Sequence, residues 1–198
     1  MTNGAAAPST VRRFEGAEAG ELAAQAAVFE DLQYVLRCCE HLVTALAPPQ
    51  PDIAFVEALW TGALVGYVRC FSARQEVLTE ADLKELQLDG DVTEFHDMIK
   101  KLRDHYASRH LNPRESFTIG VAQSNDGKPT GVAVVSTPRP LVDDTTVRLL
   151  GRVAYALSGL LDKRMQQSQE RVLEAAGRLS PGELSRLPLL HLADSPTG

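Results

Sequence analysis

Apolar side chains recur every three or four residues over most of this 198-residue chain, which is the period of an amphipathic α-helix. The first stripe consists of Leu22, Ala26, Phe29, Leu32, Leu36, Cys39, Val43 and Leu46. The pattern predicts helices over about 21–46, 53–73, 79–86, 91–110 and 143–178. Most of the chain is therefore expected to be helical.

Polar residues mark where several of these helices begin. The sequence APPQPD ends the first helix, because a helix interior does not tolerate three prolines, and its Asp52 is placed to cap the next helix. Thr79 followed by Asp82 resembles a capping box for the short helix. Asp143 or Asp144 is expected to cap the last long helix.

The hydrophobic period changes to two after the fourth helix. Phe117, Ile119 and Val121 alternate with smaller or polar residues, and Val132 and Val134 do so again beyond the turn sequence SNDGKP. Alternation on both sides of an Asn-Asp-Gly turn is typical of a β-hairpin. The expected fold class is therefore mainly α, an antiparallel bundle of four to five helices with a β-hairpin inserted at about 116–136.

The two ends of the chain differ from this pattern. Residues 1–18 are rich in Ala, Gly, Pro and Thr, and a disordered tail is expected there. The helical bundle is expected over 19–179, followed by a short tail at 180–198 in which Ser180 and Pro181 can start one more helical turn.

Composition and charge exclude only a few classes of function. The net charge of −6 argues against non-specific binding of long nucleic acid over the whole surface, yet 100–114 holds five Lys or Arg and one acid. Three cysteines are too few for a disulfide framework. The first twenty residues lack a secretory signal, and the longest apolar run, Ala58 to Val68, is too short to span a bilayer. A cytoplasmic protein without a membrane role is expected.

Candidate chemistry lies in the segment FHDMIKKLRDHYASRH, Phe95 to His110. As a helix it carries an apolar stripe that comprises Phe95, Met98, Ile99, Leu102 and Tyr106. His96, Arg103 and His110 are seven residues apart, a spacing that turns a helix by about 700° and aligns them on a neighbouring face. Such a helix can pack in a bundle and present a polar site at the same time.

Structural roles remain open for the same residues. Arg103 can pair with Glu94 or Asp97 on the bundle surface, and His110 can interact with the dipole at the end of the helix. The three histidines of the segment lie nine and five residues apart, spacings that do not converge on one helix face. No metal site and no cofactor is predicted.

The sequence RDHYASRH, late on a helix of a mainly helical chain, resembles the signature of the HEPN superfamily, an arginine and a histidine separated by four to six residues. Members are helical bundles of toxin–antitoxin, phage-defence and RNA-processing systems, and many are metal-independent endoribonucleases that act as dimers. The resemblance covers about residues 21–175 and implies a homodimer that cleaves RNA. The acidic net charge and the β-hairpin depart from the simplest members.

The resemblance implies catalytic roles for Arg103 and His110, with Asp104 in support. His110 suits an acid or base because its unperturbed pKa is near neutrality, and the guanidinium of Arg103 suits a phosphate. Phosphate contacts are expected from Lys100, Lys101 and Arg109.

Two other functions fit the same sequence. The chain can be a non-catalytic module whose bundle and long last helix bind a protein partner such as an antitoxin. It can also be a small-ligand sensor that uses the hairpin and the final helix.

Overall fold

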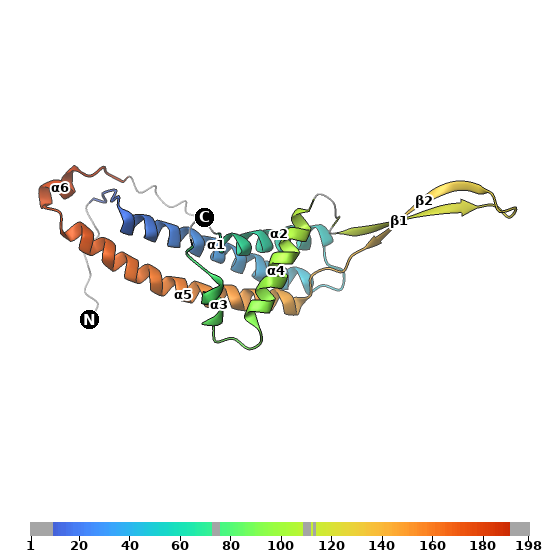
Figure 1. Ribbon diagram of the computed structural model, residues 1–198, viewed down its shortest axis with the longest axis horizontal. Helices are drawn as coiled ribbons and strands as arrows, with labels where there is room; N and C mark the ends of the chain where they lie inside the picture. The colour runs from blue at the N-terminus through green and yellow to red at the C-terminus, as the bar shows by residue number, and fades with distance from the viewer. Residues whose placement is uncertain (1–9, 73–75, 109–111, 113, 191–198) are drawn as a thin grey trace. The chain divides into compact units, whose positions relative to one another are not determined.

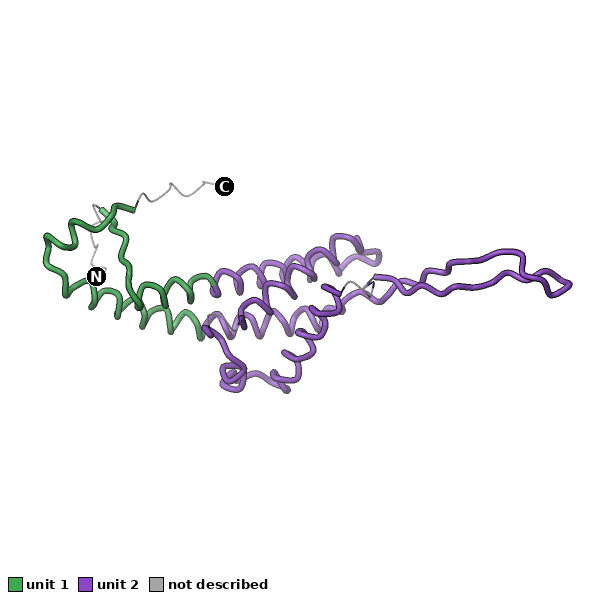
Figure 2. The backbone as a smooth tube through the Cα atoms, turned by 45° about the horizontal axis from the view of Figure 1, so that its top comes forward, with its two compact units in different colours: residues 1–27, 160–198 green, residues 28–159 purple. Residues whose placement is uncertain are grey.

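The computed structural model describes residues 10–72, 76–108, 112 and 114–190 (Figure 1). The described residues form six helices and one two-stranded hairpin, which confirms the expectation of a mainly helical bundle with an inserted β-hairpin. In chain order the elements are α1 (Ala17–Leu46), α2 (Ile53–Arg69), α3 (Glu80–Lys84), α4 (Val92–Ala107), β1 (Glu115–Gln123), β2 (Pro129–Pro138), α5 (Asp144–Gly177) and α6 (Pro181–Arg186). The chain divides into a larger unit, residues 28–159, and a smaller unit, residues 1–27 and 160–198 (Figure 2).

The core of the larger unit is built from the apolar stripes of four helices. Its buried side chains include Leu32, Val35 and Leu42 of α1, Trp60, Leu64 and Tyr67 of α2, Phe95 and Ile99 of α4, and Leu150, Val153 and Leu157 of α5. Helices α1 and α2 approach closely at Gly66, where an added Cβ would lie 3.1 Å from Cγ2 of Val35. Trp60 and Tyr67 are core residues, since their exposed fractions are 2% and 0%.

Side-chain caps fix the starts of α2 and α3. The carboxylate of Asp52 accepts hydrogen bonds from the backbone N–H groups of Ala54 and Phe55, at 3.0 and 3.2 Å. The Asp82 carboxylate accepts from both the backbone N–H and the hydroxyl of Thr79, which confirms the predicted capping box. These caps satisfy donors that the first turn of a helix leaves unpaired.

Helix α4 ends earlier than its sequence pattern predicts. Its last helical residue is Ala107, and Ser108 follows in an extended conformation with φ −68° and ψ 137°. The continuation of the helix through Ser108 that the pattern predicts is therefore wrong, while Arg109 and His110 lie outside the described residues. The apolar stripe is also wrong at one position, because Met98 is 38% exposed whereas Phe95 and Ile99 are buried.

Strands β1 and β2 form an antiparallel hairpin whose register places Ile119 opposite Val134 and Val121 opposite Val132. A register shift follows Ala122, and Gly127 in the turn has φ +83°, a conformation that glycine adopts without strain. Large apolar side chains of both strands are exposed, among them Ile119, Val121 and Val132.

The smaller unit joins the two ends of the chain. Arg12 and Leu189 form an antiparallel bridge, and the Arg12 guanidinium donates to the carbonyl of Leu187 at 2.8 Å. Arg171 of α5 pairs with Glu21 of α1 at 2.5 Å. Ser180 and Glu183 form the capping box of α6, which confirms the extra helical turn expected there.

The three cysteines, Cys38, Cys39 and Cys70, are buried free thiols in the larger unit. Burial raises the pKa of Cys39 and of Cys70 to about 12, so both remain protonated at neutral pH. None of the helices in the described parts of the chain is long and apolar enough to cross a bilayer.

Candidate functional site

A cavity of about 440 Å³ lies in the larger unit beside α4. Helices α2, α3 and α4 and the chain between α2 and α3 supply its lining, which consists of Val68, Phe71, Ser72, Glu76, Leu78, Thr79, Glu80, His96, Lys100 and Arg103. Three of these residues are spaced four and three apart on α4, so they share one face of the helix: His96, Lys100 and Arg103. The predicted alignment of His96 with Arg103 is thus realised.

His96 is a buried residue rather than a surface one. Its exposed fraction is 0%, and its ring packs edge-on against Phe71 with 4.4 Å between ring centroids. The Nδ1 atom lies 3.1 Å from the hydroxyl oxygen of Tyr67, whereas Nε2 has no hydrogen-bond partner among the described residues. His96 is therefore packed in the core and is not presented on a polar surface of α4.

The hydrogen bond from Tyr67 assigns the tautomer of this imidazole. Tyr67 is 0% exposed, and Nδ1 of His96 is the one acceptor that the described residues offer its hydroxyl hydrogen. Nδ1 therefore accepts, and the neutral ring carries its proton on Nε2. Burial lowers the pKa of His96 and Lys100 lowers it further, while Glu80 and Asp97 oppose this effect. The ring is accordingly neutral at pH 7, with an unpaired N–H donor.

Lys100 and Glu80 form an ion pair at the mouth of the cavity, with 3.1 Å between Nζ and Oε1. The hydrogen bond from Lys100 lowers the pKa of the Glu80 carboxyl, which is therefore ionised near neutral pH. Because an ammonium group has three donors, the pair leaves further Lys100 donors for another group.

Arg103 contributes a second buried donor. One terminal nitrogen, Nη1, lies 3.1 Å from Oδ1 of Asp104, while Nε is buried and has no partner within the described parts of the chain. The ion-pair partner is thus Asp104, not Glu94 or Asp97 as the alternative reading of the sequence allowed. The supporting role predicted for Asp104 in catalysis stays a prediction.

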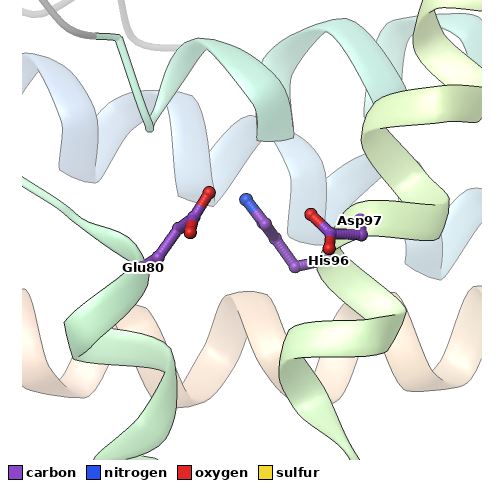
Figure 3. A group of neighbouring side chains, drawn as sticks. All are labelled: Glu80, His96 and Asp97. Atoms are coloured by element: carbon purple, nitrogen blue, oxygen red, sulfur yellow. The ribbon is translucent and has the colours of Figure 1, made fainter.

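Glu80, His96 and Asp97 also form a group that could hold a metal ion (Figure 3). One ligand atom from each lies within 4.8 Å of the others, and Figure 3 shows the imidazole edge pointing toward the Glu80 carboxylate. Nitrogen and carboxylate ligands suit zinc. Two features oppose this use: Nε2 must lose its proton to bind a metal, and Lys100 already pairs with Glu80.

The structure brings together only part of the residue set predicted from the sequence. Lys100 and Arg103 line the cavity, whereas Lys101 is exposed and does not line it. Arg109 and His110 lie outside the described residues. Tyr67 and Glu80 were missed, because they come from other helices and no spacing along the sequence connects them to α4.

Comparisons with known proteins add no assignment of these residues. No family model, no curated protein and no solved structure matches the chain. The roles of the cavity residues must therefore be argued from their geometry and chemistry.

Proposed function

We propose that the chain is a HEPN-like protein that acts on RNA and cleaves it without a metal ion. The observation that carries this proposal is the face of α4 on which Lys100 and Arg103 line one cavity. The side chain of Arg103 is 38% exposed and pairs, among the described residues, with the carboxylate of Asp104 alone, so part of its guanidinium is open to a phosphate. A guanidinium fits the geometry of phosphate oxygens and keeps its charge at every physiological pH.

The proposed reaction is an internal transesterification. A base takes the proton of the 2′-hydroxyl, the 2′-oxygen bonds to phosphorus, and the bond from phosphorus to the 5′-oxygen breaks as an acid protonates that oxygen. The products are a 2′,3′-cyclic phosphate and a 5′-hydroxyl. Arg103 stabilises the charge on the phosphate oxygens, and His110 is proposed as the acid or base.

The support for the two catalytic residues is unequal. Because α4 ends at Ala107, alignment along one helix no longer supports the pairing of Arg103 with His110. The role of His110 rests on the resemblance of RDHYASRH to the family motif, as do the phosphate contacts proposed for Lys101 and Arg109. A two-fold dimer would supply a second histidine to a shared site.

RNA cleavage in EDTA tests this proposal. The wild-type protein is expected to produce fragments with cyclic-phosphate ends, and Arg103→Ala and His110→Ala are each expected to abolish them. Arg152→Ala is the matched control, since Arg152 is an arginine of α5 whose partner is Asp89. Equal cleavage by all four proteins, or none by the wild type, would remove the nuclease proposal.

The hairpin favours a second candidate, a non-catalytic interaction module that self-associates. Its register places five large apolar side chains on one face, with exposed fractions of 54% to 72%: Phe117, Ile119 and Val121 of β1 and Val132 and Val134 of β2. An isolated two-stranded hairpin is at best marginally stable in water. These five side chains carry no charge, and Glu115, at the end of the same face, accepts a hydrogen bond from the Ser136 hydroxyl at 2.7 Å, so two copies can pack over the apolar centre of the face. We therefore propose that a second copy of this chain packs against this apolar face.

Sedimentation of the full chain tests this assignment. The wild type is expected to be a dimer and Ile119→Lys a monomer, because the substitution puts a charge in the centre of the apolar face. Thr118→Lys is the control, since Thr118 pairs with Val135 on the opposite face and is exposed. A monomeric wild type, or equal dissociation of both variants, would refute self-association through this face and leave it to a different protein.

A further inference from the structure

The cavity beside α4 has features that RNA cleavage does not use. We propose that it binds the anionic end, a carboxylate or a phosphate, of a small ligand through Nε2–H of His96, Nε–H of Arg103 and Nζ of Lys100. The site shares Arg103 with the proposed nuclease function but does not rest on it, because a protein that cleaves no RNA can still bind such a ligand.

Two buried donors that have no partner among the described residues line this cavity. Nε2 of His96 and Nε of Arg103 are the side-chain donors in this cavity for which the described residues supply no acceptor. Folded proteins pair nearly all buried polar groups, because an unpaired one loses its bonds to water without replacement. The side chain of His96 is 0% exposed, so an acceptor for its Nε2–H group has to come from inside the cavity. The arrangement calls for an acceptor group.

The third donor in the cavity is the ammonium group of Lys100, and its positive charge favours an anion as the acceptor. Lys100 lines the cavity four residues from His96 and three from Arg103, and its Nζ retains donors beyond the bond to Glu80. A carboxylate or phosphate offers several oxygens to such donors, and hydrogen bonds between charged groups are roughly twice as strong as neutral ones.

Glu80 modulates this site rather than binding the ligand. Its carboxylate faces the His96 imidazole (Figure 3), within the 4.8 Å that separates the ligand atoms of the group. An anion that enters must approach this like charge and share Lys100 with it. Removal of the Glu80 charge is therefore expected to strengthen the binding of an anion. The same change would weaken the binding of a metal ion.

The size and walls of the cavity indicate a small ligand with an apolar body. About 440 Å³ lies within the range of small-molecule sites, and Val68, Phe71 and Leu78 supply apolar lining. A terminal phosphate or carboxylate can enter the cavity end-on, toward Nε2 of His96. An internal phosphate of RNA carries a nucleoside on each side and is too bulky for that depth.

Calorimetric titration of the full chain with phenyl phosphate and with benzoate tests the proposal, and the comparison separates a phosphate site from a carboxylate site. One of the two is expected to bind at a single site. Lys100→Ala is expected to weaken binding by about tenfold or more, the effect of a charged hydrogen bond. Lys163→Ala is the matched control, since Lys163 is an exposed lysine of α5 that does not line the cavity. Glu80→Gln is expected to tighten binding.

Three outcomes would overturn the proposal: neither probe binds, both lysine variants weaken binding equally, or the chain binds Zn²⁺ at one site and loses it in Glu80→Gln. The last result would assign the residues to a metal. Anion binding without RNA cleavage would support the anion site and refute the nuclease proposal. RNA cleavage without anion binding would support the nuclease proposal and refute the anion site. If both hold, the bound probe should inhibit cleavage competitively.

Discussion

Removal of the Tyr67 hydroxyl is the sharpest test of how the cavity is built. In Tyr67→Phe the ring that packs in the core is kept, and only the oxygen 3.1 Å from Nδ1 of His96 is lost. Both side chains are 0% exposed, so water cannot replace the missing donor. An unsatisfied buried acceptor costs about 1–3 kcal/mol of unfolding free energy. For a protein of this size each kcal/mol corresponds to about 2–4 °C in Tm.

Urea unfolding of a double-mutant cycle measures this coupling directly. The cycle comprises the wild type, Tyr67→Phe, His96→Phe and the double variant, all at pH 7.5. Tyr67→Phe is expected to lose about 1–3 kcal/mol when His96 is present and to have no cost, or a gain, when position 96 is Phe, because no acceptor is then left unpaired. An equal loss in both backgrounds would refute the hydrogen bond and the tautomer assigned from it.

Three further predictions concern stability and reactivity. Because burial lowers the pKa of His96, the folded state resists protonation of this ring. The stability of the fold is therefore complete above about pH 6.5, the pKa of an unfolded histidine, and falls as the pH drops below it. The urea midpoint of the wild type should be lower at pH 5.5 than at pH 7.5, and the difference should be smaller in His96→Phe. Asp52→Ala should lose about 0.5–2 kcal/mol of unfolding free energy, because two backbone donors at the start of α2 lose their acceptor, and an unchanged midpoint would contradict the cap. Cys39 and Cys70 should resist iodoacetamide at pH 8 until urea unfolds the chain, and rapid labelling of the folded protein would contradict their burial.

Much of the fold follows from patterns that are local in sequence. Helical periodicity and the caps at Asp52 and Thr79 place α2 and α3 correctly at their starts, and alternation around SNDGKP places the hairpin. Helix ends are predicted less well, as α4 shows. Its periodic pattern continues to His110, but Ser108 is extended, with ψ 137°, and its backbone N–H donates to the carbonyl of His105 at 3.3 Å. An apolar pattern does not register such a change of backbone conformation at a helix end.

Only the partly exposed cations of the site could be predicted from the sequence. Lys100 and Arg103 stand out as cations at helical spacing, and the cavity contains both. The burial of His96 was not predictable, because it depends on Tyr67 and Phe71, which lie on and just beyond α2 and far from His96 in sequence. Periodicity assigns a residue to a face of its helix, but which neighbour covers that face is a property of the tertiary structure. The same limit explains why Glu80 was missed.

The double variant Tyr67→Phe/His96→Phe separates what the fold needs from what the cavity needs. An apolar pair of similar shape removes the unpaired Nε2 donor, and replacing both partners of a buried polar pair in this way is often neutral or stabilising. The double variant is therefore expected to be at least as stable as the wild type in urea, and to bind phenyl phosphate or benzoate at least tenfold more weakly. A stable variant that still binds would show that Arg103 and Lys100 suffice for the anion. A strongly destabilised one would show that the imidazole serves packing, since His96 would then stabilise the core in spite of its unpaired donor.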